Sequence, residues 1–409
     1  MIESGSNSRQ ELPCTGQPAY CRLLMFLCSY SSLLKIFAFH LCFGFRSCLL
    51  DNATIGEQKK YKIVILISWP QPTSVSRLGC VVASLTPEHR YQQKMEGITP
   101  GRRIPLVDLG QLGLMYDEEP SQEEWQRVAR QLHDAFTDIG FVYLTNHGVS
   151  DDQMDHLFKS SATFFNLDEE TKIRYQRDPE TQQGYVAVDR ETLDKSKNSH
   201  ELREAYDLKS IDGLFPDAEV PSLRPAMTSF LKSCTTLNNR LLIAMAHSLG
   251  LERNFFISTH KDICSDNNMS CLRLLHYPSV PNTVPENTIR CGAHTDYGTI
   301  TLLFQDNMGG LQVRERGGSW VEAVPVPGTI LVNVGDLLQF WTADKFLATE
   351  HRVLIPREEV RLKASRHSIV FFIHPDNPVL IKPLDNSSSY QPINARDHVL
   401  KKFRHTYNY

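Results

Sequence analysis

The chain has 409 residues, enough for one large domain or two ordinary ones, with 22% charged residues and a net charge of −4. Because the charges are mixed in sign and slightly acidic overall, the composition argues against binding to nucleic acid or to an anionic membrane surface. The ten cysteines include no CxxC pair, which argues against a zinc ribbon or a thioredoxin-type motif. The last four cysteines indicate reduced thiols, so we expect a cytoplasmic protein.

The first hundred residues differ in character from the rest. Residues 23–45 are almost wholly apolar, but Lys35 divides them into runs shorter than the roughly 20 residues that span a bilayer. A secretory signal fits poorly, since no small-residue cleavage site follows cleanly. We therefore expect residues 1–99 to form a poorly structured leader outside the folded core, with a membrane anchor as the alternative.

From about Ile104 the pattern becomes regular and mostly helical. Ser121 to Glu124 form a capping box, and apolar residues then recur at helical spacing until Gly140 stops the helix. Ser150 caps a second helix. The expected elements are a helix from Ser121 to Gly140, a strand over 141–145, a helix opening at Ser150, and a long helix over 222–249.

Beyond Cys271 the pattern changes to short apolar runs separated by Gly, Pro and Asn. The predicted strands are Cys271–Tyr277, Thr299–Phe304, Leu311–Arg314, Trp320–Val324, Thr329–Val332, Leu337–Trp341, Arg352–Ile355 and Ser368–His374. Short strands at this spacing are typical of an all-β sandwich, a jelly roll or a small barrel.

The stretch CGAHTDYG at 291–298 places His294 and Asp296 two residues apart in a strand-like run. On a strand, residues at i and i+2 point to the same face. His351, at the start of a later predicted strand, offers a third group. Two imidazoles and one carboxylate on one face of a metal ion leave three positions open, as in non-heme Fe(II) oxygenases. Each residue alone is more often structural, so the indication comes from the combination.

From about Ile104 to Phe403 the chain resembles the iron(II)/2-oxoglutarate-dependent dioxygenases of the isopenicillin N synthase-like family. The motifs that carry the resemblance are IPLVDL at 104–109, FTDIGF at 136–141, NHGV at 146–149, LRLLHYP at 272–278, HTDYG at 294–298, GGLQV at 309–313, NVGD at 333–336, HRV at 351–353 and RHS at 366–368. So many matches in one order make coincidence a poor explanation.

The resemblance implies an α+β fold with a mainly β core, a double-stranded β-helix (jelly roll) flanked by N-terminal helices. It implies a helical N-terminal region over 100–250, a catalytic core over 251–385 and a helical tail over 386–409. His294, Asp296 and His351 would bind Fe(II), with no further catalytic residue needed.

The implied enzyme oxidises a small organic substrate and releases succinate and CO2. Hydroxylation is the usual outcome in this family, and desaturation or ring closure are the alternatives. Its co-substrates would be 2-oxoglutarate and O2, and ascorbate would support it. We expect a monomer with no nucleic-acid or membrane partner.

Arg366 and Ser368 lie at i and i+2 of a predicted strand, so they should point inward together. An Arg fork with a nearby hydroxyl suits the distal carboxylate of 2-oxoglutarate, and Tyr277 holds the family position that adds a phenol. Arg361, at the spacing more usual in plant members, is the fallback for Arg366. Tyr185 is a candidate for substrate contact.

Two alternatives stay open. One is an oxidase of the same fold that uses no 2-oxoglutarate, since such an enzyme can keep an Arg-x-Ser pair for its substrate. The other is a catalytically silent metal-binding protein. Succinate formed per turnover separates the first from the implied enzyme, and metal analysis with O2 uptake separates the second.

Overall fold

A computed structural model describes residues 104–193, 200–281, 283, 285, 287–355, 362–387 and 390–407, together with four short strands nearer the N-terminus. The chain divides into two units, Met1–Thr99 and Pro100–Tyr409. The first unit contains the antiparallel pairs β1 (Arg22–Leu24) with β2 (Ala38–His40) and β3 (Ile63–Ser68) with β4 (Leu78–Ala83). Most of the apolar stretch 23–45, including Lys35, lies outside the described residues. Among those described, no helix has the length and apolar character to cross a membrane.

Two sheets form the core of the second unit. The larger has eight strands in the order β5 (Leu106–Asp108), β6 (Phe141–Thr145), β16 (Ile330–Val334), β13 (Ile300–Gln305), β18 (Arg366–Ile373), β10 (Cys271–Tyr277), β9 (Glu204–Leu208) and β7 (Gly184–Val186). The smaller has four, in the order β12 (Cys291–His294), β17 (His351–Val353), β14 (Leu311–Arg314) and β15 (Trp320–Glu322). Two short pairs complete the strands, β11 (Thr288–Ile289) with β8 (His200–Glu201) and β19 (Leu380–Ile381) with β20 (Ile393–Asn394).

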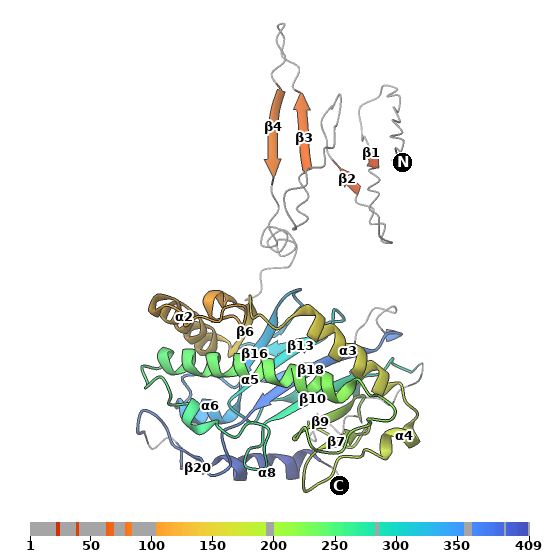
Figure 1. Cartoon of the computed structure of the whole chain (residues 1–409), viewed down its shortest axis with the longest axis vertical. Helices are drawn as coiled ribbons and strands as arrows, with labels where there is room; N and C mark the ends of the chain where they lie inside the picture. The colour runs from red at the N-terminus through yellow and green to blue at the C-terminus, as the bar shows by residue number, and fades with distance from the viewer. Residues whose placement is uncertain are drawn as a thin grey trace, which may run out of the picture. The chain divides into compact units, whose positions relative to one another are not determined.

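Helices α3 (Asp151–Phe165) and α5 (Leu223–Ser248) run across one face of the larger sheet (Figure 1). The other helices are α2 (Gln122–Asp138), α4 (Glu169–Ile173), α6 (Asp336–Trp341) and α8 (Ala395–Thr406), with the short 3-10 helices η1 (Gly110–Leu112) and η3 (Ile257–Thr259). The predicted caps are confirmed. Ser121 Oγ accepts from the Glu124 amide at 3.2 Å, Ser150 Oγ accepts from that of Gln153 at 3.2 Å, and Gly140 has a φ of +73°.

Strand alternation divides the apolar residues between two cores. On β18, Ile369, Phe371 and Ile373 face the helices and join the larger core cluster. Val370 faces the other way, into a second cluster with Leu311, Val313 and Val353 of the smaller sheet. The interior of the jelly roll therefore lies between the two sheets. Arg366, Ser368 and Val370 are alternate residues of β18, so all three side chains point into this interior.

One predicted element is wrong. Residues 337–341 form helix α6 rather than a strand, because a short apolar run has the same pattern in a buried helical turn as in a buried strand. Besides β5 and the expected β6, the region 100–250 supplies β7 and β9 to the larger sheet, and the sequence pattern did not indicate these two strands. β9 is buried along its whole length and therefore shows no alternation of polar and apolar residues.

Because two histidines are buried in the folded protein, we expect it to lose stability as the pH falls. His260 is 3% exposed, and its ring nitrogens lie 2.7 Å from Phe256 O and 2.8 Å from Thr299 Oγ1. Burial lowers the pKa of His260 to about 4 and that of His374 to about 3, so both stay neutral in the folded protein. The unfolded chain binds protons at these residues below a pH of about 6.5. Their contribution to the free energy of unfolding is therefore full above about pH 6.5, and it is lost as the pH falls from there to about 4 for His260 and to about 3 for His374.

Urea titrations at about pH 7 and about pH 5 measure this effect, and the midpoint should fall at the lower pH. His156→Ala, at an exposed position of α3, is the control and should leave the pH dependence unchanged. A midpoint that stays constant over this range would contradict the expectation.

Candidate active site

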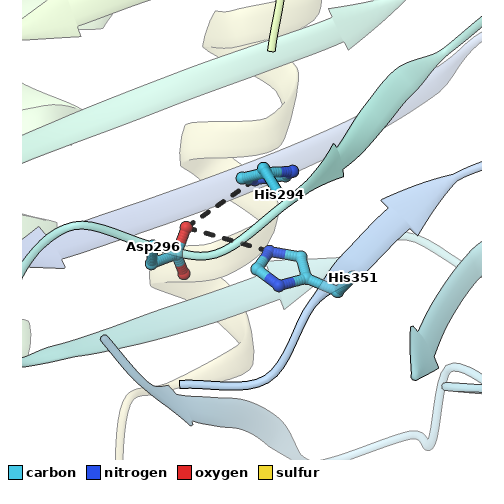
Figure 2. Close-up of side chains that lie close together, drawn as sticks. All are labelled: His294, Asp296 and His351. Carbon is cyan, nitrogen blue, oxygen red and sulfur yellow. Dashed lines mark ion pairs between the residues drawn. The ribbon is translucent and has the colours of Figure 1, made fainter. Parts of the chain in front are cut away.

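Three side chains from separate parts of the chain converge inside the jelly roll. His294 ends β12 and His351 begins β17, and the two are register partners across the smaller sheet. Asp296 Oδ1 lies 3.7 Å from His294 Nε2 and 3.8 Å from His351 Nε2. Figure 2 shows the two imidazoles and the carboxylate directed toward a common point. One ligand atom from each residue lies within 4.8 Å of the other two.

Backbone carbonyls orient both imidazoles. His294 Nδ1 lies 2.8 Å from Gly292 O, and His351 Nδ1 lies 3.1 Å from Thr349 O. A ring nitrogen beside a carbonyl must carry its proton to bond it, so each neutral ring keeps an unprotonated Nε2. Burial, followed by the nearby His294, lowers the pKa of His351 to about 4. The Nε2 lone pair of His351 is therefore available to a metal ion at neutral pH, and the bond at Nδ1 of His294 turns its Nε2 toward the same point.

Asp296 lies two residues beyond the end of β12, so the prediction that it shares a strand with His294 is wrong. Two other contacts hold Asp296, one to its carboxylate and one to its backbone carbonyl. Asn333 on β16 donates from Nδ2 to Asp296 Oδ2 at 2.7 Å, and the Asp336 amide donates to the Asp296 carbonyl at 2.7 Å. Burial acts to raise the pKa of Asp296, but His351, His294 and the bond from Asn333 outweigh it and the pKa is lowered.

The donor set fits Fe(II). Two imidazole nitrogens and one carboxylate oxygen on one side of an ion form the facial arrangement of non-heme iron oxygenases, which leaves positions for O2 and a chelating co-substrate. Asp296 is 5% exposed and His351 9%, so the protein shields the site from bulk water on the ligand side. Among the described residues, His294, Asp296 and His351 are the one group of three possible metal ligands whose ligand atoms converge.

Gly298 fixes the path of the backbone after Asp296. A Cβ atom at Gly298 would overlap the carbonyl oxygen of Ile373 on β18, and one at Gly335 would overlap the backbone of Gly298. The loop that carries Asp296 can therefore lie against β18 only if no side chain intervenes.

We expect Gly298→Ala to weaken Fe(II) binding and to lower the thermal midpoint, since the loop must move away from β18 and take Asp296 with it. Gly317→Ala is the matched control, because a Cβ there meets no atom within 4 Å. Equilibrium titration with Fe(II) under nitrogen measures the first effect, and thermal unfolding measures the second. Equal Fe(II) affinity in the two variants would contradict this account.

Arg366, Ser368 and Tyr277 lie together on the same interior face. Tyr277 of β10 is the register partner of Arg366 on β18, and the Arg366 guanidinium lies 4.8 Å from the Tyr277 ring centre. Arg366 is 1% exposed and donates to Gly309 O at 3.0 Å, to Gln305 Oε1 at 3.2 Å and to Ser368 Oγ at 3.4 Å. Its described partners are all uncharged, so a buried guanidinium here suits an anion.

The remaining predicted residues lie elsewhere. The Tyr185 hydroxyl donates to Glu204 and Glu169, and Tyr185 is not among the residues that line the cavity at His294. His276 lies 2.7 Å from Glu204 and stacks on His367, on the helix side of the sheet, as expected for a packing role. Arg361 lies outside the described residues.

Sequence reasoning missed a narrow cavity of about 70 Å³ beside His294 and Asp296. Buried charged side chains line it, among them Arg203 and Arg273, together with Tyr297 and the aromatic residues Phe403 and Tyr407 of the C-terminal segment. The signal available was the run HELREAYDL at 200–208, which places charges inside a strand-like stretch.

Comparison with known families agrees with this geometry. The model described as the 2OG-Fe(II) oxygenase superfamily matches residues 268–375, which include all three candidate metal ligands. A second family model matches residues 104–225, and its description is "non-haem dioxygenase in morphine synthesis N-terminal". Together they cover the two halves of the folded unit.

Individual relatives extend over nearly the whole unit. A 2-oxoglutarate-Fe(II) type oxidoreductase of Metarhizium rileyi is 33% identical over 70% of this chain and 84% of that protein. A proline hydroxylase of Petromyces alliaceus is 34% identical over 66% of this chain and 87% of that protein.

Among solved structures, a full-length Neurospora crassa protein in complex with alpha-KG and thymine matches with a TM-score of 0.64 and 30% identity, over 75% of this chain and 98% of that one. Sequence families, relatives and fold agree with the converging His, Asp and His side chains. The chain belongs to the 2-oxoglutarate-Fe(II) oxygenase superfamily and has its jelly-roll fold, its oxidoreductase chemistry and its requirement for Fe(II), 2-oxoglutarate and O2.

Proposed function

We propose that this chain hydroxylates a small organic molecule at a centre held by His294, Asp296 and His351. The observation that carries the proposal is that these three ligand atoms converge within 4.8 Å of one another while Arg366 lies buried on the interior face of the same jelly roll. The two imidazoles and the carboxylate suit a divalent metal ion, and the Arg366 guanidinium suits the far carboxylate of a dicarboxylic acid.

Fe(II), when bound, supplies the redox chemistry in which 2-oxoglutarate, O2 and a substrate C–H bond become succinate, CO2 and a C–OH group. The protein binds and orients the reactants. Arg366, Ser368 and Tyr277 would hold the distal carboxylate of 2-oxoglutarate and so orient the co-substrate. The buried wall around Asp296 excludes water from the reacting centre.

The named relatives support a small substrate. One is a proline hydroxylase, and the Neurospora crassa protein was solved with thymine, so the fold at this degree of similarity accepts compact polar molecules. The cavity beside His294 is narrow, about 70 Å³, which favours a compact substrate over a large one. Ascorbate, by keeping the iron reduced between turnovers, would support the activity.

The region from Pro100 onward carries this function on its own in our proposal. Residues 1–99 are a leader outside the catalytic unit, 100–250 form the N-terminal region, 251–385 the catalytic core and 386–409 the tail. The enzyme acts as a monomer in a reducing compartment, in line with free thiols at Cys234, Cys264, Cys271 and Cys291. A chain truncated before Thr99 should keep full activity.

Anaerobically prepared protein given Fe(II), ascorbate, 2-oxoglutarate and then O2 tests the proposal, with small-molecule panels as substrates. We expect one succinate for each substrate molecule hydroxylated, and none from the His294→Ala variant. Substrate oxidation without succinate would instead identify an oxidase that does not use 2-oxoglutarate. Succinate formation that survives the loss of His294 would remove that residue from the site.

A further inference from the structure

The cavity beside the metal-binding residues contains buried charged groups that the proposed chemistry does not use. We call them the charged cluster, and its members are Arg177, Arg203, Lys209, Arg273, Glu191, Glu201 and Asp207. All except Glu201 line the cavity together with His294 and Asp296. Since burying charge is costly without partners, each member of the cluster should be paired or should face a ligand.

Most of the cluster is well paired. Arg273 donates to Asp207 Oδ1 at 2.6 Å and to Glu191 Oε2 at 3.0 Å, and Arg177 donates to Asp207 Oδ2 at 2.9 Å. Lys209 donates to two main-chain carbonyl oxygens, those of Asn268 at 2.7 Å and Ser270 at 2.8 Å. These contacts satisfy Arg273 and Lys209 and fix their positions.

Arg203 differs from its neighbours. It is 6% exposed, and its Nη2 lies 2.9 Å from Glu201 Oε2 and 3.4 Å from Glu191 Oε2. Neither contact has the alignment of a hydrogen bond, and within the described part of the chain Arg203 Nε and Nη2 have no hydrogen-bond partner. Buried donors without a hydrogen-bond partner are unfavourable, so Arg203 would gain from a ligand in the cavity that it lines.

The position of Arg203 is fixed by its backbone. It lies between β8 and β9, where the neighbouring Leu202 amide donates to Ile289 O of β11 at 2.8 Å, and β12 begins two residues after Ile289. Arg203 and His294 line the same cavity, so a molecule held by Arg203 would lie beside the metal-binding residues.

The charge of the cluster favours an anion. It contains four cations and three carboxylates, which leaves one positive charge in excess. Bound Fe(II), Asp296, doubly charged 2-oxoglutarate and Arg366 balance one another, so they do not offset that charge. The aromatic rings of Tyr297, Phe403 and Tyr407 on the cavity wall can pack against the apolar part of the same molecule.

We propose that Arg203 receives a carboxylate of the substrate, and hence that the substrates of this enzyme are small organic acids. The proposal rests on the proposed function and adds the chemical class of the substrate. A guanidinium with two unpaired donors binds a carboxylate through two parallel hydrogen bonds, which neither a neutral amide nor an ester can match.

Matched pairs of acids and primary amides test the proposal directly. The panel contains L-proline, L-arginine, L-tyrosine, benzoate and phenylacetate, each beside its amide. Calorimetric titration under nitrogen measures their binding to full-length protein loaded with Fe(II) and 2-oxoglutarate. We expect at least one acid to bind about tenfold to a hundredfold more tightly than its amide, the range for a hydrogen bond between charged groups.

Variants assign that preference to Arg203. Arg203→Gln should bring the acid to the affinity of its amide and leave the affinity for 2-oxoglutarate unchanged. Arg203→Lys, which keeps the charge in case the Gln variant fails to fold, should retain part of the preference. Arg240→Gln is the control, because Arg240 donates to the carbonyls of Leu112 and Gly113 and is not among the residues that line the cavity.

Three results would overturn the proposal. They are equal binding of every acid and its amide, a preference that persists in Arg203→Gln, and an equal loss of 2-oxoglutarate affinity in that variant, which would place Arg203 at the co-substrate instead. Failure of the proposed function looks different, since no succinate would then form from 2-oxoglutarate with any substrate. Succinate formed with a neutral substrate would refute the acid specificity alone.

Discussion

Replacing His351 by alanine is expected to abolish hydroxylation and to weaken Fe(II) binding severely. The variant would leave His294 Nε2 and one carboxylate oxygen of Asp296, and two protein ligands cannot hold the ion facially with three positions open. Stability should change little by comparison, because His351 begins a strand whose pairing uses backbone atoms. The measurement is Fe(II) affinity by equilibrium titration under nitrogen, beside succinate formation.

His156→Ala is the control for the His351 variant, since His156 lies exposed on α3 away from the site. It should keep the affinity and turnover of the unmodified chain. Retained Fe(II) binding and turnover in His351→Ala would show that the ion is held by other residues, and the assignment of the triad would then be wrong.

Arg366→Lys is expected to raise the KM for 2-oxoglutarate by about tenfold to a hundredfold, with Fe(II) affinity unchanged. A lysine ammonium keeps the positive charge but loses the planar fork that binds a carboxylate at two points. It also loses the geometry of the bonds from Arg366 to Gly309 and Gln305, which fix the guanidinium in the interior. Initial rates at varied 2-oxoglutarate measure the effect.

Arg352→Lys is the matched control, because Arg352 also lies on a core strand but donates to Gln312 and stacks on Trp320. Its KM for 2-oxoglutarate should stay the same. If Arg366→Lys left this KM unchanged while a lysine at Arg361 raised it, the fallback residue would bind the co-substrate.

Local sequence patterns predicted the elements that depend on local physics. The caps Ser121 and Ser150 fixed where α2 and α3 begin, and the boundaries of β10 and β14 agree with the apolar runs that predicted them. The prediction failed at α6, where four apolar residues and Gln339 are equally compatible with one helical turn or a strand. It failed at β9 because full burial removes the alternation that marks a strand.

The candidate site was predictable in part. His294 and Asp296 stand close together in the sequence, and the family resemblance supplied His351, which lies far along the chain. The spacing argument selected a pair that converges in the structure, but through the wrong geometry, since the contact from Asn333, and not a shared strand, positions Asp296.

The charged cluster could be predicted only in part from local patterns. Arg203 and Asp207 share the run HELREAYDL at 200–208, but Arg273 lies in a distant segment, and the burial of these residues depends on how β9 and β10 pair across the larger sheet. The charges of that run are unusual for a buried strand, but the sequence does not show which residues they meet. Only the folded arrangement shows that they line the cavity beside His294.

The central claim is that one Fe(II) ion binds to His294, Asp296 and His351 and to no other protein side chain. Crystals grown under nitrogen with Fe(II), with diffraction recorded on both sides of the iron absorption edge, test it most directly. The account predicts a single anomalous peak per chain, bonded to both Nε2 atoms and to Asp296 Oδ1. A peak elsewhere, or none at these three residues in iron-loaded crystals, would contradict it.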